Sequence, residues 1–235
     1  MKSILSASEM QAIDRATMEE HNVPSLVLME RAAMAVTDVI LENYPEAHEI
    51  FVICGPGNNG GDGVAIARLL HLKGKQVVCT ILGDERRYSE QLNAEIDIAD
   101  SYQVPIFYTL DCDEVKKPDL VVDAMFGIGL SRGLEDKYAV VAECMNNTEV
   151  PVVSVDMPSG YDTNTGKLLG QVGVRADICV TFAYMKKGLL LGECKEAAGQ
   201  VIVADVGIYA KDESGYARLL DDEILSKAPV RSVSA

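Results

Sequence analysis

The feature of this sequence that most restricts its fold is a regular alternation of strand-like and helix-like runs. Short apolar runs rich in Val and Ile alternate with amphipathic runs of helical period. Strands are expected at 50–54, 76–82, 105–108, 119–123, 151–155, 177–182 and 201–205, and helices at 62–73, 89–101 and 135–147, with a short helical turn after 108. This alternation predicts an α/β fold: a three-layer αβα, Rossmann-like sandwich around a mostly parallel sheet.

Two extra helices are expected before the first strand. Ser6 and Glu9 have the spacing of a capping box, which predicts a helix through Glu20. Pro24 is expected to open a second helix that runs to about Tyr44. Residues 1–220 are therefore expected to form one domain.

Composition restricts the partners and the compartment. The chain has 235 residues, is 48% hydrophobic and carries a formal charge of −15, which argues against a nucleic-acid or acidic-membrane binder. We find no run as apolar as a membrane span and no secretory signal at the amino terminus, so a cytoplasmic protein is expected. The six cysteines form no C-x-x-C pair and are expected to be free thiols, mostly buried.

A polar, Gly-rich segment at 55–63 separates the first expected strand of the alternation from its helix. It matches G-x-G-x-x-G at Gly55, Gly57 and Gly60, and Asp84 falls about where a ribose-binding acid would stand. The segment lacks the Lys-Ser/Thr pair of a P-loop. We interpret it as a flexible ligand loop rather than a packing element, with backbone amides that bind phosphate.

Two carboxylates follow other strands of the predicted sheet. Asp123 ends the strand at 119–123 and is followed by a Gly-rich stretch, and Asp156 follows the strand at 151–155. Parallel strands bring these ends to one edge, beside the loop at 55–63. Each aspartate alone is also consistent with a helix N-cap or a turn. Together with the Gly-rich loop, they favour a ligand site.

These segments resemble the YjeF N-terminal domain family of NAD(P)HX epimerases, which includes the apolipoprotein A-I-binding protein. The resemblance covers nearly the whole chain. It rests on motifs at 28–32, 55–63, 123–129, 155–160, 176–177, 181–182 and 203–208.

The resemblance implies an isomerase that interconverts the R and S forms of hydrated NADH and NADPH at C6 of the nicotinamide ring. It also implies a separate ADP- or ATP-dependent dehydratase that consumes the S form, and a homodimer. The ligands implied for a potassium ion are Asn59, Asp123 and Ser159. The residues implied to bind the substrate are Asn58, Asn59, Gly60, Gly61, Asp62, Gly127, Ile128, Gly129, Leu130, Ser131, Arg132, Gly133 and Asp156.

The substrate's chemistry suggests a catalytic role for Asp156. Its hydrated carbon is a hemiaminal, so protonation of the hydroxyl lets the ring nitrogen expel water and leaves a planar iminium. Asp156 is the candidate acid, provided that its neighbours raise its pKa. Ring opening through an aldehyde is an equally open route. Among phosphate contacts, Arg132 is preferred to Lys186 and Lys187, which are expected to face solvent.

Two other functions compete with the epimerase. Similar domains in mRNA-decapping enhancer proteins serve as scaffolds, but a scaffold has no need of Asn59, Asp123, Asp156 and Ser159. An ordinary NAD-dependent oxidoreductase would need a Tyr-x-x-x-Lys or His-acid pair, and neither is recognisable. Residues 221–235 are interpreted as a tail or as a linker toward an absent dehydratase domain.

Overall fold

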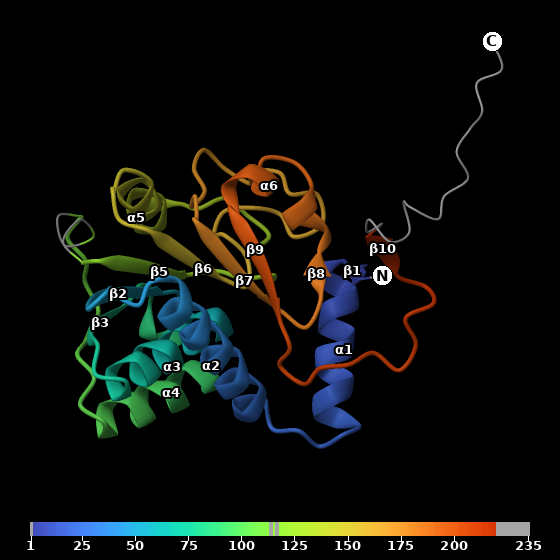
Figure 1. The fold of residues 1–235 in the computed structure, drawn as a ribbon, viewed down its shortest axis with the longest axis horizontal. Helices are drawn as coiled ribbons and strands as arrows, with labels where there is room; N and C mark the ends of the chain where they lie inside the picture. The colour runs from blue at the N-terminus through green and yellow to red at the C-terminus, as the bar shows by residue number, and fades with distance from the viewer. Residues whose placement is uncertain (1, 113–114, 116–117, 220–235) are drawn as a thin grey trace, which may run out of the picture.

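The computed structural model describes residues 2–112, 115 and 118–219 of the chain (Figure 1). Its centre is a seven-stranded sheet of order β4-β3-β2-β5-β6-β7-β9, in which every neighbouring pair is parallel. The expected parallel sheet is thus confirmed. The strands are β2 Glu49–Cys54, β3 Gln76–Ile81, β4 Ile106–Phe107, β5 Leu120–Ala124, β6 Val152–Val155, β7 Ile178–Phe182 and β9 Gln200–Ala204.

Helices cover both faces of this sheet, as the alternation predicts. Figure 1 shows α2, α3 and α4 on one side and α5 and α6 on the other. Each face has its own apolar cluster, because alternate strand residues point to opposite sides. The helices are α2 Ser25–Asn43, α3 Asn58–Leu72, α4 Glu90–Ser101, α5 Asp136–Asn146 and α6 Cys194–Ala197, with one-turn 3₁₀ helices at Glu85–Arg87 and Lys187–Leu190.

A second, three-stranded sheet joins the two ends of the described chain. Strand β1, Lys2–Leu5, lies between β8, Met185–Lys186, and β10, Ala217–Leu219, parallel to the former and antiparallel to the latter. Helix α1, Ala7–Glu19, follows β1. The expectation that helices open the chain is therefore corrected. A four-residue strand whose partners lie about 180 to 220 residues away leaves no periodic signal in the sequence.

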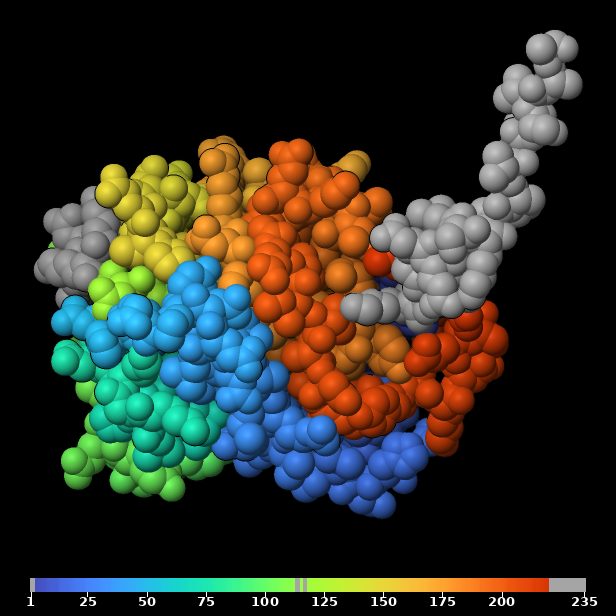
Figure 2. Space-filling view, in the orientation of Figure 1, coloured from blue at the N-terminus to red at the C-terminus, as the bar shows by residue number. Residues whose placement is uncertain are grey.

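Helix α1 and the segment after β9 pack together beside the main sheet. Leu5, Met10 and Ile13 share one apolar cluster with Val206 and Ile208. In Figure 2 the orange-red segment beyond β9 lies directly against the blue N-terminal region. This packing fixes α1 at the edge of the sheet, near the carboxyl ends of the strands.

The Gly-rich segment is mostly helix, which corrects its interpretation as a flexible loop. Helix α3 begins at Asn58, not at residue 62. Two of the glycines allow close packing: a Cβ on Gly63 would lie 2.5 Å from the Ala124 Cβ, and one on Gly60 would lie 1.9 Å from the Gly55 oxygen. Small residues here let the start of α3 approach β2 and β5. These glycines therefore have a packing role in addition to exposing backbone amides.

The expectation that all cysteines are free is wrong for one pair. Cys112, before β5, and Cys144, in α5, form a disulfide with a Cα–Cα distance of 5.7 Å. The other four cysteines are free and buried. The sequence separation of 32 residues gave no sign that these two approach each other. The expected helical turn after residue 108 falls partly outside the described residues, and the tail at 221–235 lies outside them. Within the described part, no helix is long and apolar enough to cross a membrane.

Candidate active site

A cavity of about 540 Å³ lies at the carboxyl ends of β2, β5, β6 and β7. Its lining comes from α1, α2 and the segments that follow these strands. The parallel sheet thus brings the Gly-rich segment and the residues after β5 and β6 together, as the sequence predicts. The predicted site residues that line the cavity are Asn58, Asn59, Asp62, Gly127, Ile128, Gly129, Leu130 and Asp156.

The first turn of α3 forms one side of the cavity. In a helix that begins at Asn58, the first amides have no intrahelical acceptor, and the first backbone bond within this turn runs from Gly61 to the Gly57 oxygen. The Nδ2 atom of Asn59 is buried and has no hydrogen-bond partner among the described residues. The turn therefore offers amide donors to an anionic ligand.

Gly127 separates two polar side chains of the site. A Cβ at this position would lie 2.8 Å from the Asn59 Oδ1 and 2.9 Å from the Asp156 Oδ2. Both distances are too short for a carbon atom, so a larger residue would displace one of these side chains. The absence of a side chain at Gly127 keeps Asn59 and Asp156 on either side of an open space.

Three donors contact the side chain of Asp156. Its Oδ1 accepts a 2.9 Å contact from the Lys186 ammonium and a 3.2 Å hydrogen bond from the Thr181 hydroxyl. Its Oδ2 accepts a 3.3 Å hydrogen bond from the Ile128 amide. The residue itself has a φ of +67°, a left-handed conformation in which the chain leaves β6 sharply. This turn directs the side chain into the cavity.

Lys186 is a site residue that the sequence analysis missed. Its side chain is 1% exposed, so the expectation that it faces solvent is wrong. The ammonium donates to the Phe182 oxygen at 2.7 Å as well as to Asp156. The register of β1 against β8 pairs Leu5 with Lys186, so the second sheet fixes the lysine. A buried lysine without a partner would be costly, and the pairing with Asp156 offsets that cost.

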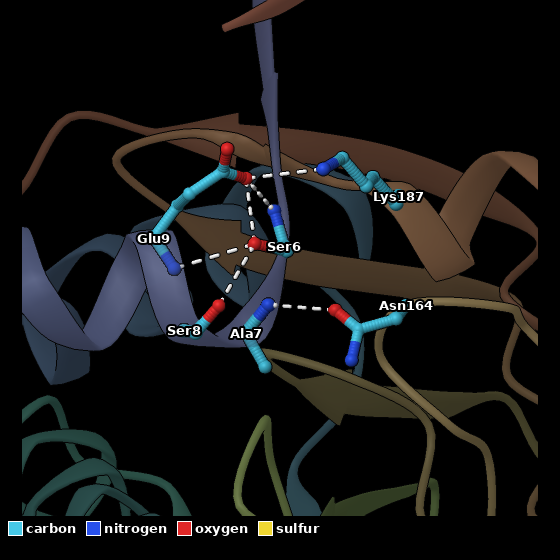
Figure 3. Close-up of polar contacts among 6 residues, drawn as sticks. All are labelled: Ser6, Ala7, Ser8, Glu9, Asn164 and Lys187. Atoms are coloured by element: carbon cyan, nitrogen blue, oxygen red, sulfur yellow. Dashed lines mark hydrogen bonds and ion pairs between the residues drawn. The ribbon is translucent and has the colours of Figure 1, made fainter.

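Polar contacts tie the start of α1 to the segment around β8 (Figure 3). Glu9 forms the expected capping box with Ser6 and also accepts from the Lys187 ammonium at 3.1 Å. The Ala7 amide donates to the Asn164 Oδ1 at 2.9 Å. Lys187 is about one-third exposed, in contrast to its neighbour. These contacts hold α1 against the residues that carry Lys186.

Asp123 lies behind the cavity in a fully buried polar network. Its carboxylate accepts from the Ser159 hydroxyl at 2.7 Å, the Ser159 amide at 2.9 Å and the Ser154 hydroxyl at 3.0 Å. The Ser159 hydroxyl also lies 3.3 Å from the Phe126 oxygen. Burial raises the pKa of Asp123, although these hydrogen bonds oppose the rise. The structure thus brings Asp123 and Ser159 into direct contact.

Two further carboxylates line the cavity and have raised pKa values. Burial raises the pKa of Asp62 well above its ordinary range, and the negative charges of Asp156, Glu95 and Asp14 add to the rise. Burial raises the pKa of Asp14 to about 6, while the Lys186 ammonium opposes the rise. The cavity therefore holds three aspartates and one lysine.

Other predicted residues lie outside the cavity wall. Gly60 and Gly61 are buried in the first turn of α3 and do not line the cavity. Ser131, Arg132 and Gly133 follow Leu130 in the chain and also lie outside the lining. The lining includes the exposed Arg87 instead. Asp84 hydrogen-bonds Arg86 and caps the first 3₁₀ helix. No local pattern distinguishes Arg87 from its neighbours, so sequence reasoning could not have found it.

The fold and the cavity define a Rossmann-like α/β protein with its ligand site at the carboxyl edge of a parallel sheet. The model of the family described as YjeF-related protein N-terminus matches residues 25–188. The chain belongs to this family.

Named relatives and one solved structure agree with this assignment. The chain is 47% identical to the NAD(P)H-hydrate epimerase of Limosilactobacillus fermentum over 206 residues, which are 87% of this chain and 98% of that protein. It is 38% identical to the NAD(P)H-hydrate epimerase of Levilactobacillus brevis over 93% of this chain and all of that protein. The crystal structure of the yeast protein ynu0 superposes with a TM-score of 0.73 at 25% identity, covering 86% of this chain and 87% of that one.

Proposed function

We propose that this protein is an NAD(P)H-hydrate epimerase, which interconverts the R and S forms of hydrated NADH and NADPH at C6 of the nicotinamide ring. The observation that carries the proposal is the 47% identity to an epimerase over 98% of that relative's length. The cavity supports it, because the Asp156–Lys186 pair supplies charged groups beside an open space that Gly127 maintains.

The dinucleotide phosphates would bind at the first turn of α3. The chain carries a net charge of −15, so its overall field repels an anionic ligand and local donors must bind it. The amides of Asn58 and Asn59 and the Arg87 guanidinium line the cavity and meet this need. The neighbouring segment from Gly127 to Leu130, which lines the cavity, is proposed to contact the rest of the substrate.

A potassium ion is proposed as the cofactor, held by Asn59, Asp123 and Ser159. The donor set fits a hard monovalent cation, because it combines one buried carboxylate with neutral amide and hydroxyl oxygens. When bound, the ion supplies positive charge beside Asp123.

Epimerisation requires one group that gives a proton and one that accepts it. On the iminium route, an acid protonates the departing hydroxyl and a base takes a proton from the water that returns. On the ring-opening route, a base takes the hydroxyl proton and an acid protonates the ring nitrogen. We propose that Asp156 serves as the catalytic carboxylate, because Lys186, Thr181 and Ile128 hold its side chain in the cavity wall.

A coupled assay tests the function. A mixture of R and S hydrates is supplied to an S-specific dehydratase, with and without this protein, at a pH where spontaneous epimerisation is slow. We expect the R fraction to be consumed only when the protein is present, and D156N to lose this activity by at least 100-fold. D38N, which changes an exposed aspartate of α2, is the matched control. Failure of the wild type to consume R hydrate would refute the proposal.

Pairing with a dehydratase and a homodimeric state are also proposed. Because such a dehydratase removes only the S form, the epimerase would make the remaining hydrate available to it. Val27 and Met34, on α2, are about half exposed and offer apolar surface for a second copy of the chain. Light scattering coupled to size-exclusion chromatography distinguishes a dimer of about 51 kDa, twice the 25.4 kDa of one chain, from a monomer.

A further inference from the structure

Asp14, on α1, lines the cavity together with Asp62, Asp156 and Lys186. It lies on the face of α1 that lines the cavity, between Met10 and Met18 at helical spacing. Its Oδ1 atom is buried and, among the described residues, has no hydrogen-bond partner. Buried carboxylate oxygens are normally paired, so an unpaired one in a ligand cavity indicates a partner that arrives with the ligand.

The fold fixes Asp14 in the same cavity as the Asp156–Lys186 pair. The Glu9–Lys187 contact and the Ser6 cap hold the first turn of α1 beside β8, and Asp14 lies five residues further along the same helix. Asp14 interacts electrostatically with both Lys186 and Asp156. The buried position of Ile13 in the apolar cluster fixes the rotation of the helix and keeps Asp14 on the cavity side.

Resting on the proposed epimerase function, we propose that Asp14 is a second catalytic residue, which donates the proton to the hydroxyl group that leaves the substrate. The Asp14 O–H bond breaks as its proton joins the hydroxyl oxygen, and the C6–O bond breaks to release water. The ring nitrogen supplies the electron pair for the new N1=C6 bond. Water then adds to C6 from either face and returns a proton, by way of Asp156 or directly, to the Asp14 carboxylate.

The groups around Asp14 suit it to this role better than those around Asp156. Burial raises the pKa of Asp14 to about 6 and the negative charge of Asp156 adds to the rise, while the Lys186 ammonium opposes it. Asp62, on α3, also faces this region and interacts with Asp14. A carboxyl group with a pKa near 6 keeps a protonated fraction of roughly one-tenth at pH 7, far more than an ordinary aspartate.

The test compares D14N, D14E and E19Q with the wild type in the coupled assay from pH 5 to 9. The spontaneous rate is measured without enzyme and subtracted at each pH. Because a general acid contributes about 100- to 10,000-fold, we expect D14N to lower kcat at least 100-fold. D14E, which retains the acid, should recover at least tenfold of that loss. E19Q removes an exposed charge from α1 and should leave kcat unchanged.

The pH profile separates catalysis from a structural role. Wild-type kcat should fall tenfold per pH unit above the pKa of the acid, and D14N should lack this limb. Substrate-induced thermal stabilisation should show that D14N still binds the hydrate within about threefold. A D14N enzyme with kcat within threefold of the wild type, or with the same alkaline limb, would overturn the role of Asp14. An inactive wild type would instead refute the epimerase itself.

Discussion

Replacement of Lys186 by Met should destabilise the protein more than the same replacement of an exposed lysine. The Lys186 side chain is 1% exposed and the Asp156 side chain is 11% exposed, so their 2.9 Å contact is shielded from water. Met has a similar length and no charge, so K186M removes the ammonium but largely fills its space. The Asp156 carboxylate then stays in the site without its cation.

The magnitude follows from what remains around Asp156. Removing one partner of a buried ion pair costs about 3–5 kcal/mol. The hydrogen bonds from Thr181 and Ile128 remain and offset part of this cost. We therefore expect K186M to lower the free energy of unfolding by about 2–3 kcal/mol. For a chain of this size that corresponds to a melting temperature lower by roughly 4–12 °C.

Guanidinium-induced unfolding at pH 7 measures this difference, with K187M as the matched control. Lys187 is the next residue and pairs with Glu9, but both side chains are about one-third exposed. Exposed ion pairs contribute about 0–1 kcal/mol, so K187M should lower the free energy of unfolding by less than about 1 kcal/mol. If K186M and K187M were equally stable, the buried ion pair would not have the energetic role that we assign to it.

Three further predictions concern packing, protonation and the cation. G63A should lower stability by about 1–3 kcal/mol in thermal unfolding, because its Cβ would lie 2.5 Å from the Ala124 Cβ, whereas G215A, with nothing within 4 Å, should not. Relative to the wild type, D14N should gain up to about 3 kcal/mol in free energy of unfolding at pH 7.5 and only about 0.5 kcal/mol at pH 4. The raised pKa of Asp14, about 6, means that the folded state prefers the protonated form, so this contribution to stability is complete below the ordinary pKa of 3.8 and is lost as the pH rises through 6. Equal gains at both pH values would contradict this reasoning. Exchange of potassium for lithium should lower the melting temperature of the wild type but not of D123N, and an ion-independent melting temperature in the wild type would argue against the proposed cation site.

The sequence predicted the parts of the site that are encoded locally. Asp123 and Asp156 could be placed in advance because each follows an apolar run, and the ends of parallel strands meet at one edge of a sheet. The Gly-rich segment could be assigned to the same edge, but its helical start could not, because glycines and asparagines are weak helix formers. Tertiary packing of α3 against β2 and β5 overrides that preference.

The sequence alone determined the seven-stranded parallel sheet, its covering helices and the edge where a ligand would bind, because periodicity and strand ends are local properties. Only the tertiary structure placed Lys186 in the cavity, gave Asp14 its charged neighbours and joined Cys112 to Cys144. These features depend on residues far apart in the chain, held together by β1 pairing with β8 and by α1 packing beside the sheet. A side chain's protonation and burial follow from its neighbours in space, and a single sequence records its neighbours only along the chain.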